Sequence, residues 1–267
     1  MYELVSRRIN AERCVLFGWS RAILLQLAHP LVAAGVAEHS SFHDGGFTAV
    51  VRLHHTIRAM LALAFGDERG RQAALDGIRA IHRRVHGRLP AAAGIFPAGT
   101  PYTAEDPDLV LWVHATLVES IPPVYELLVQ PLTGEERDAY CVEAASIAVD
   151  LGARSDEVPR TWAATAAYLD RMYQSGAIAV SAQARELAAL VVSPPFGRLV
   201  APAAWANRLM TVGLLPDDIR RQFGLTWSAR QARMLRSVTT ILRSARRLTP
   251  NAVALWPEAK HVSSRGL

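Results

Sequence analysis

Helix-forming residues dominate this chain, and the spacing that β-strands require is missing from it. Alanine, leucine and arginine are its commonest residues, and all three favour the α-helix. No run of alternating β-branched residues is bounded by turn residues, as a strand would be. Glycine and proline instead divide the sequence into stretches of helical length. We therefore expect an all-α fold.

Start and stop signals define the expected helices. A proline inside a helix removes a backbone hydrogen bond, so Pro122-Pro123 should kink or break the helix that contains them. The stretch Thr133 to Glu136 matches a capping box, and Pro159 suits the first turn of a helix.

No linker or repeat divides the chain, so we expect one domain (1–267) with a core over about 19–248 and an irregular tail over 249–267. The expected helices are 19–39 with a disturbance at Pro30, 47–65, 67–85, one from about 107 to 122–123, 133–152, 159–173, 181–192, and two or three more within 200–248.

The composition predicts a sizeable core and no membrane span. Hydrophobic residues make up 51% of the 267 positions. The uncharged run Ala22–Ala37 is sixteen residues long and contains a glutamine, a histidine and a proline. A spanning helix needs about 20 mostly apolar residues. The N-terminus carries no signal-peptide pattern, so we expect a soluble, cytoplasmic protein.

The net charge of +5 raises the question of nucleic-acid binding. Lys260 is the only lysine, and such a replacement of lysine by arginine is typical of a high-GC coding bias. The arginines are spread along the chain, and the densest region, Arg220–Arg247, resembles the solvent-facing sides of two amphipathic helices. We therefore do not expect nucleic acid as a partner.

The expected helix over residues 47–65 places an arginine, a histidine and a threonine on one face. At 100° per residue, Arg52, His55 and Thr56 point the same way, whereas His54 points away. Apolar neighbours indicate that this helix is largely buried. A buried guanidinium needs a partner, because leaving it unpaired costs several kcal/mol. That partner is either a carboxylate or water at a helix end, or a bound ligand.

The next expected helix carries a histidine on its apolar stripe. His82 lies in the same arc as Leu75 and Ile78, and Arg79 and His86 lie at the edge of that arc. Most histidines in such places are hydrogen-bonded core residues. The functional alternative is specific, because a neutral imidazole nitrogen is a good axial ligand for haem iron.

Other catalytic and metal-binding patterns fit the sequence less well. His82 and His86 have the H-x-x-x-H spacing of a zinc site, but Arg83 stands where a metalloprotease has glutamate. A di-iron bundle needs Glu-x-x-His on two helices, and the expected helices hold no such pair. Cys14 and Cys141 have no CxxC context, which argues against a disulfide framework or a thiolate site. Hydrolase elbows, Walker loops and dinucleotide-binding glycine motifs are also missing.

Two further histidines lie in apolar helical segments. His29 follows Leu25-Gln26-Leu27-Ala28, and His114 lies within Leu111–Leu117. The plain interpretation of each is a structural hydrogen bond. The functional one is a wall of a cofactor pocket or a contact to a ligating group.

Several of these segments together resemble the DUF2236 family, also called MpaB-type oxygenases, which includes the rubber oxygenases (latex-clearing proteins). The resemblance covers roughly residues 19–173 and extends more loosely over the remainder. Its specificity comes from the combination of pieces. They are QLAHP and GVAEHS within Arg21–Ser40, FGDE at Phe65–Glu68, Ile81-His82 with Val85, and LWVHATLV at Leu111–Val118.

The resemblance implies a globin-like helical core, with additional helices, around a b-type haem. In rubber oxygenases a helix with Arg-x-x-Lys-Thr lies on the distal side of the haem, and a histidine on a following helix is the proximal ligand. Here Arg52–Thr56 matches the distal motif and His82 matches the proximal histidine. The lysine position, which can itself coordinate iron, is His55, so the sixth coordination position is either His55 or open. Because this chain is shorter than rubber oxygenases, rubber itself is not the expected substrate.

These inferences predict a haem-dependent oxygenase or oxidase. His82 would bind the iron, and Arg52, His55 and Thr56 would face dioxygen or peroxide, where a guanidinium and a hydroxyl stabilise developing negative charge. Arg79 is placed to pair with a haem propionate, and His86, His29 and His114 complete the candidate cofactor site. The expected substrate is small and mostly hydrophobic. A haem protein that only senses or carries a ligand, and a cofactor-free helical protein, remain alternatives, and a homo-oligomer remains open.

Overall fold

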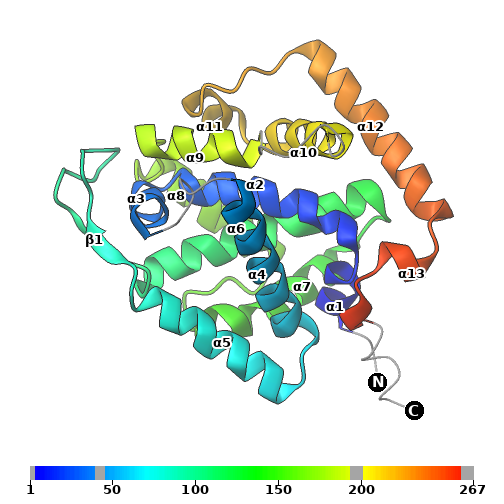
Figure 1. Cartoon of the computed structure of the whole chain (residues 1–267), viewed down its shortest axis with the longest axis horizontal. Coiled ribbons are helices and arrows are strands. Elements are labelled where there is room, and N and C mark those ends of the chain that lie inside the picture. The colour runs from blue at the N-terminus through cyan, green and yellow to red at the C-terminus, as the bar shows by residue number, and fades with distance from the viewer. Residues whose placement is uncertain (1–3, 40–45, 193–200, 260–267) are drawn as a thin grey trace.

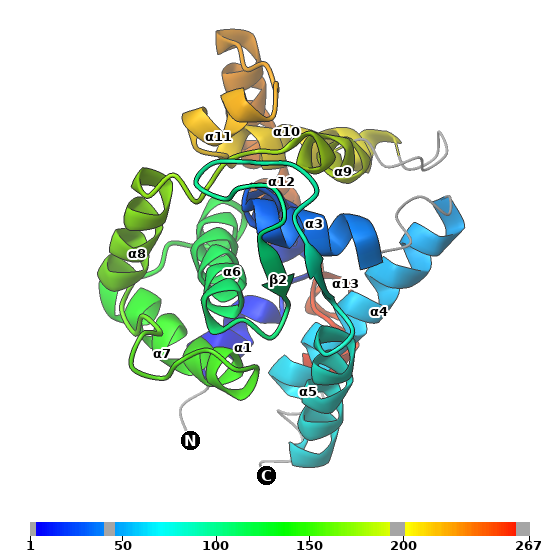
Figure 2. The same cartoon turned by 90° about the vertical axis from the view of Figure 1, so that its left-hand side faces the viewer.

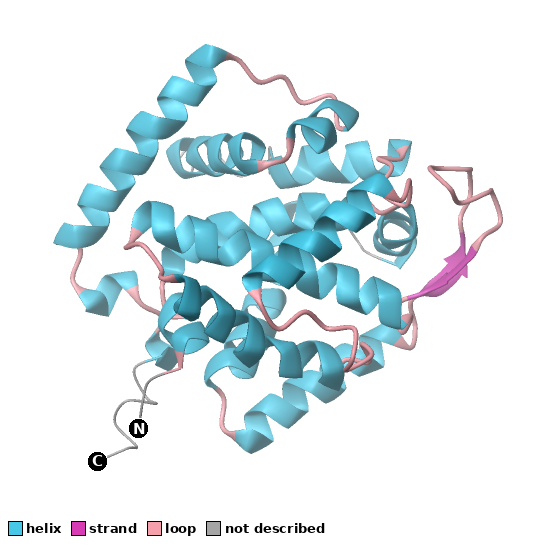
Figure 3. Ribbon diagram, turned by 180° about the vertical axis from the view of Figure 1, so that it is seen from behind, coloured by secondary structure: helices cyan, strands magenta, loops and turns pink. Residues whose placement is uncertain are grey.

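The computed structural model describes residues 4–39, 46–192 and 201–259, and there the chain is a set of α-helices with one short hairpin (Figures 1 and 3). Side chains of residues 46–54 and 201 lie outside this description. The all-α prediction is confirmed. The elements are α1 Val5–Asn10, η1 Arg13–Val15, α2 Leu16–Leu27, α3 Pro30–His39, α4 Gly46–Phe65, α5 Glu68–His82, β1 His86–Arg88, β2 Pro101–Thr103, α6 Pro107–Leu128, α7 Gly134–Asp150, α8 Trp162–Gln174, α9 Ala182–Val192, α10 Ala201–Leu214, α11 Asp217–Gln222, α12 Ala229–Leu248 and α13 Asn251–Ala254.

Capping side chains begin several of these helices where the sequence offers them. Asp67 accepts a hydrogen bond from the Gly70 backbone N–H at 2.8 Å, which starts α5. The capping box predicted at Thr133 is present at the start of α7. A second capping box, formed by Ser228 and Gln231, starts α12.

Helices α2 and α6 pack against each other at the centre of the molecule. Gly18 allows this approach, because a Cβ atom there would lie 2.7 Å from the Ser120 carbonyl oxygen of α6. Leu24 and Leu25 of α2 and Trp112 of α6 are fully buried between them and helices α8, α9 and α11. The other sides of α6 are covered by α7, α8 and α12. The core therefore forms around α6, which packs against α1, α2, α7, α8 and α12.

The disturbance predicted at Pro30 is a complete break. Helix α2 ends at Leu27, α3 begins at Pro30, and the two segments are bent by 105° relative to each other. Pro30 occupies the first helical position, where its missing N–H costs nothing. The break turns α3 away from α2 and toward the hairpin, where Gly35 packs close to Val85 and Tyr102.

Of the kink or break predicted at Pro122-Pro123, the break is wrong. Helix α6 continues through both prolines to Leu128. Each proline removes one backbone donor, and this local cost is outweighed because both flanks of the pair are packed. Ile121 and Val124 are buried, and the adjacent Ser120 carbonyl meets α2 at Gly18.

Some helix boundaries differ from those expected by a few residues. Helix α5 ends at His82, three residues earlier than predicted, because the chain turns into the hairpin. Helix α8 starts at Trp162, where Thr161 caps it, and not at Pro159. The hairpin itself was not predicted from the sequence; it pairs His86 with Thr103 and Arg88 with Pro101.

The C-terminal segment is more ordered than expected. Where an irregular tail was predicted, α13 forms after Pro250. The Trp256 N–H then donates to the Ala11 carbonyl at 3.0 Å, which joins the end of the described chain to its beginning (Figure 1). Beneath this contact, Arg246 of α12 forms a bidentate ion pair with buried Glu12.

Helices α4 and α5 form an antiparallel pair to one side of α6. Figure 2 shows α6 on one side, α4 and α5 on the other, and α3 above the space between them. Among the described side chains of α4, those of Leu61, Leu63 and Phe65 are buried. In the described ranges, no single helix is both long and apolar enough to cross a membrane; α2 and α3 qualify only as a pair, despite their 105° bend.

Candidate functional site

His82 is the last residue of α5, and its imidazole keeps some accessible surface. Burial nevertheless lowers the pKa of this imidazole, and the Glu105 carboxylate only partly offsets that effect. Within the described ranges neither ring nitrogen has a hydrogen-bond partner. His82 therefore presents a neutral imidazole whose nitrogens are available to a bound group.

His114 has the same character, two turns into α6. Its side chain keeps some accessible surface, while burial lowers its pKa to about 4. No described residue forms a hydrogen bond with this ring. The structural hydrogen bond that was the plain interpretation of His114 is thus missing from the described part of the chain. His114 is a second neutral and available imidazole.

His29 differs from these two residues because packing accounts for it. The ring is only 3% exposed, and its Nδ1 accepts a hydrogen bond from the Leu31 backbone N–H at 3.3 Å. It lies between Phe96 and Trp112, with ring centroids 5.2 and 6.4 Å away. Burial lowers its pKa to about 4, and the Asp106 carboxylate opposes this. His29 therefore has a packing role at the break between α2 and α3. This is the structural interpretation that the sequence left open for this residue.

The distal candidates lie on α4. The side chain of Arg52 is outside the described residues. His55 and Thr56 are exposed, so the expectation that this part of the helix is largely buried is wrong for them. The physical reason is that α4 packs against α5 through its C-terminal half, and its first half extends past the end of α5 (Figure 2). The exposure of His55 and Thr56 leaves both accessible to a ligand.

Arg79 and His86 are held by neighbouring groups. The Arg79 guanidinium donates to the Asp150 carbonyl at 2.6 and 3.0 Å and pairs with Asp76 at 3.1 Å. It thereby neutralises the C-terminal end of α7, where the helix dipole is negative. The His86 side chain is exposed on β1, and its backbone carbonyl contacts His39 Nε2 at 2.9 Å. Neither residue forms a hydrogen bond with His82 in the described part of the chain.

Adjacent carboxylates near the start of α6 connect two of these histidines. Attraction to the Glu105 carboxylate raises the pKa of His82, and attraction to the neighbouring Asp106 raises the pKa of His29. In both cases burial has the larger, opposite effect. Asp106 is also the N-cap of α6, where its carboxylate accepts from Asp108 N–H at 2.9 Å. The sequence analysis missed both acids. The signal for Asp106 was its position just before Pro107, which is typical of an N-cap.

Clusters of three or more histidine, cysteine or acidic side chains suited to a metal ion are absent from the described ranges. Non-haem iron and zinc sites normally need at least three protein ligands. Haem iron needs only one or two, because the porphyrin supplies the others. A single imidazole, such as that of His82, therefore suffices as the protein ligand of a haem.

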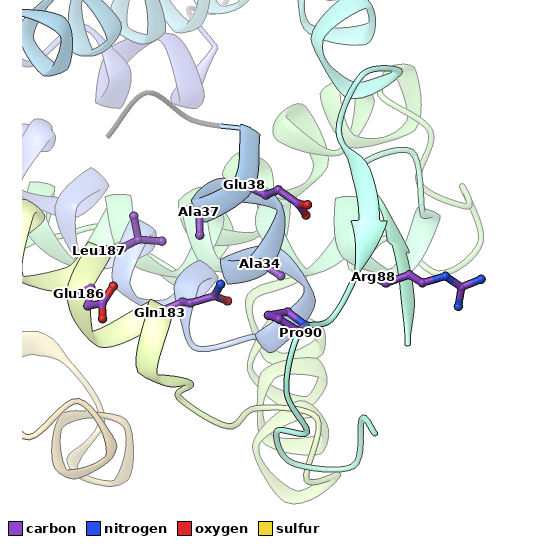
Figure 4. Close-up of a pocket in the computed structure, with 8 residues that line it drawn as sticks. All are labelled: Ala34, Ala37, Glu38, Arg88, Pro90, Gln183, Glu186 and Leu187. Carbon is purple, nitrogen blue, oxygen red and sulfur yellow. The ribbon is translucent and has the colours of Figure 1, made fainter. Parts of the chain in front are cut away.

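A hollow of about 250 Å³ lies elsewhere, between α3, α9 and the hairpin. Figure 4 shows Ala34, Ala37 and Glu38 from α3 on one side and Gln183, Glu186 and Leu187 from α9 facing them, with Arg88 and Pro90 beyond. The Glu38 carboxylate also accepts a hydrogen bond from the Tyr102 hydroxyl. None of the residues predicted for the site lines this hollow, so it is not the site built from the histidines.

A family model described as "ER-bound oxygenase mpaB/B'/Rubber oxygenase, catalytic domain" matches residues 6–244 of the chain. Two relatives are the uncharacterized proteins Mb2261 of Mycobacterium bovis and Rv2237 of Mycobacterium tuberculosis. Each is 28% identical to the chain over 232 residues, which cover 86% of this chain and 88% of the relative. No solved structure matches the chain. The globin-like character of the core thus stays a prediction.

Proposed function

Because the chain belongs to the family of ER-bound mpaB/B′ and rubber oxygenase catalytic domains, whose members are oxygenases, we propose that this oxidoreductase is a b-type haem-dependent oxygenase. Its substrate is a small, mostly hydrophobic organic molecule. The observation that carries the proposal is the state of His82. This imidazole is accessible, desolvated and without a hydrogen-bond partner in the described chain, at the end of a helix.

The described residues fit the chemistry of a haem ligand. An axial imidazole must be neutral at physiological pH, because a protonated ring has no free lone pair. Burial lowers the pKa of His82 from its ordinary 6.5, which favours that neutral form. When bound, the haem would supply the iron at which dioxygen or peroxide is activated. His82 would hold it from α5, and His114, from α6, would contact the same group or orient it.

Residues of α4 would act on the opposite side. We assign Arg52, His55 and Thr56 to the dioxygen or peroxide side on the strength of the motif, and the exposure of His55 and Thr56 is compatible with this. A guanidinium and a hydroxyl donate hydrogen bonds to an oxygen atom that gains negative charge, and so lower the barrier to reaction. His55 stands where rubber oxygenases have lysine. It would either hold a proton at its imidazole or serve as a second protein ligand to the haem.

Turnover tests the proposal directly. We expect haem-loaded protein to consume dioxygen or peroxide when a hydrophobic alkene, aldehyde or aromatic compound is added, and not when a charged analogue is added. Oxygen-electrode traces and mass spectrometry of the products, with and without an added reductant, measure this. Arg52→Ala should lower the rate by about a hundredfold, the typical effect of removing one donor to a developing anion.

The matched control is His54→Ala, which changes a residue of the same helix that the helical periodicity points away from Arg52. Its rate should equal that of the unchanged protein. Haem-loaded protein that uses neither dioxygen nor peroxide with any hydrophobic compound would contradict the oxygenase assignment and would favour a carrier or sensor.

A further inference from the structure

The C-terminal third of the chain contains a long stretch without acidic residues. Between Asp218 and Glu258 there is no aspartate or glutamate, and there are eight arginines. Most of this stretch is α12, which lies along the outer edge of the molecule and ends beside α13 (Figure 1). One side of α12 packs inward, where Leu235 and Leu242 contact the cluster around Met210.

Four of the eight arginines have structural partners. Arg220 is buried and donates to the Val212 and Leu215 carbonyls. Arg221 pairs with Asp218, Arg243 donates to the Glu126 carbonyl, and Arg246 pairs with Glu12. The contacts of Arg220, Arg243 and Arg246 hold α11 and α12 to the rest of the molecule, and the Arg221 pair lies within α11.

The remaining four arginines, Arg230, Arg233, Arg236 and Arg247, are exposed on α12. None of their guanidinium groups has a hydrogen-bond or ion-pair partner among the described residues. At 100° per residue they fall within one arc of the helix, together with Ile241 and Leu248. We call these six residues the outward face of α12.

The outward face combines positive charge with protruding aliphatic side chains. Ile241 is 65% exposed and Leu248 is 85% exposed, and Val253 of the adjoining α13 is 59% exposed. Soluble surfaces normally carry such charges with both signs interspersed. From this pattern we propose that the outward face of α12, with Val253, docks on the surface of a membrane that contains anionic phospholipids.

The combination of positive charge and exposed aliphatic side chains favours a membrane over a nucleic acid or a second copy of the chain. Arginines would pair with the headgroup phosphates, and Ile241 and Leu248 would enter the boundary between headgroups and acyl chains. A nucleic acid would satisfy the arginines but would leave the aliphatic side chains in water. A second copy of the chain would bring the same positive face against itself, which like-charge repulsion opposes. The docking is peripheral, since α12 is not apolar enough to cross a bilayer.

Vesicle flotation of the full chain tests the proposal. We expect the protein to float with vesicles of phosphatidylcholine containing about a third phosphatidylglycerol, and not with phosphatidylcholine alone. Each arginine near an anionic surface contributes about a fivefold gain in affinity. Arg230→Gln, Arg233→Gln, Arg236→Gln and Arg247→Gln combined should therefore weaken binding by on the order of a hundredfold or more, and about 0.5 M salt should have a similar effect.

A separate variant tests the aliphatic side chains of the outward face. Ile241→Ser with Leu248→Ser should weaken binding by about tenfold without changing its salt dependence, because it removes buried apolar area and no charge. The matched charge control replaces Arg69, Arg154, Arg160 and Arg171, which are exposed on α5, α8 and the loop before α8, by glutamine. This control should bind like the unchanged protein, and circular dichroism should show equal helix content for all variants.

Three results would overturn the proposal. Equal flotation with neutral and anionic vesicles would remove the role of charge. An equal loss in the control variant would show that net charge, and not the outward face, is responsible. Binding to duplex DNA without flotation, or dimerisation that the α12 variants abolish, would assign the face to another partner.

Discussion

Replacing His82 by glycine is expected to lower the affinity of the protein for haem by more than about a hundredfold and to abolish axial imidazole ligation. Losses of 10- to 100-fold are typical when only a residue supporting a metal ligand is removed, so loss of the ligand itself should exceed them. The Soret band of the ferric protein should shift accordingly. Added imidazole should restore the original spectrum, because glycine leaves room at the end of α5 for the free ring.

His39→Gln is the control for this substitution. His39 is an exposed imidazole at the end of α3, and a glutamine amide can replace its contact with the His86 carbonyl. Its spectrum should not change. If His82→Gly kept the spectrum of the unchanged protein and His114→Gly lost it, the axial ligand would be the imidazole on α6 and the assignment to His82 would be wrong.

Replacing Arg21 by methionine is expected to lower the free energy of unfolding by about 2 to 4 kcal/mol, because it breaks a largely buried ion pair. The Arg21 side chain is 8% exposed. It pairs with Glu119 and donates to Ser120 Oγ and to the Leu214 carbonyl, both at 2.7 Å. It therefore connects α2 to both α6 and α10. Urea unfolding followed by circular dichroism measures the change.

A second substitution separates charge from packing. With Glu119→Gln added, no carboxylate is left unpaired, so the double variant should be more stable than Arg21→Met alone. Arg154→Ala, which breaks an exposed ion pair with Asp108, should leave the unfolding curve unchanged. A double variant less stable than Arg21→Met would show that the pair is not the source of the effect.

Local chemistry explains which parts of the fold were predictable from the sequence. Capping at Thr133 is decided within one turn of chain, and this cap was predicted from the sequence. Pro30 also acts on its own helix. A disturbance was predicted at this residue from the sequence, and the structure has a complete break there. These features depend on residues within four positions of each other, which is the range that a sequence pattern shows.

Features decided by packing were not predictable in this way. Pro122-Pro123 do not break α6, since the helices around it hold both flanks. The tail after Pro250 gains order from contacts with Ala11 and Glu12, more than two hundred positions earlier in the chain. The exposure of His55 follows from where α4 extends beyond α5, which depends on the relative placement of two helices.

For the candidate histidines, too, the local sequence pattern and the packing give different information. His29, His82 and His114 all stand in apolar helical patterns, and the helical periodicity alone does not distinguish them. The structure separates them by hydrogen bonding and burial. His29 has an acceptor role and is packed between two aromatic rings, whereas His82 and His114 have no partner in the described chain and keep accessible surface.

The haem content of the purified chain tests the central claim most directly. Protein saturated with hemin and freed of excess should contain one haem b per chain by the pyridine haemochrome assay, with a ferric spectrum typical of imidazole ligation. A protein that remains colourless after incubation with hemin would contradict the claim, and would leave the available imidazoles of α5 and α6 without the ligand proposed for them.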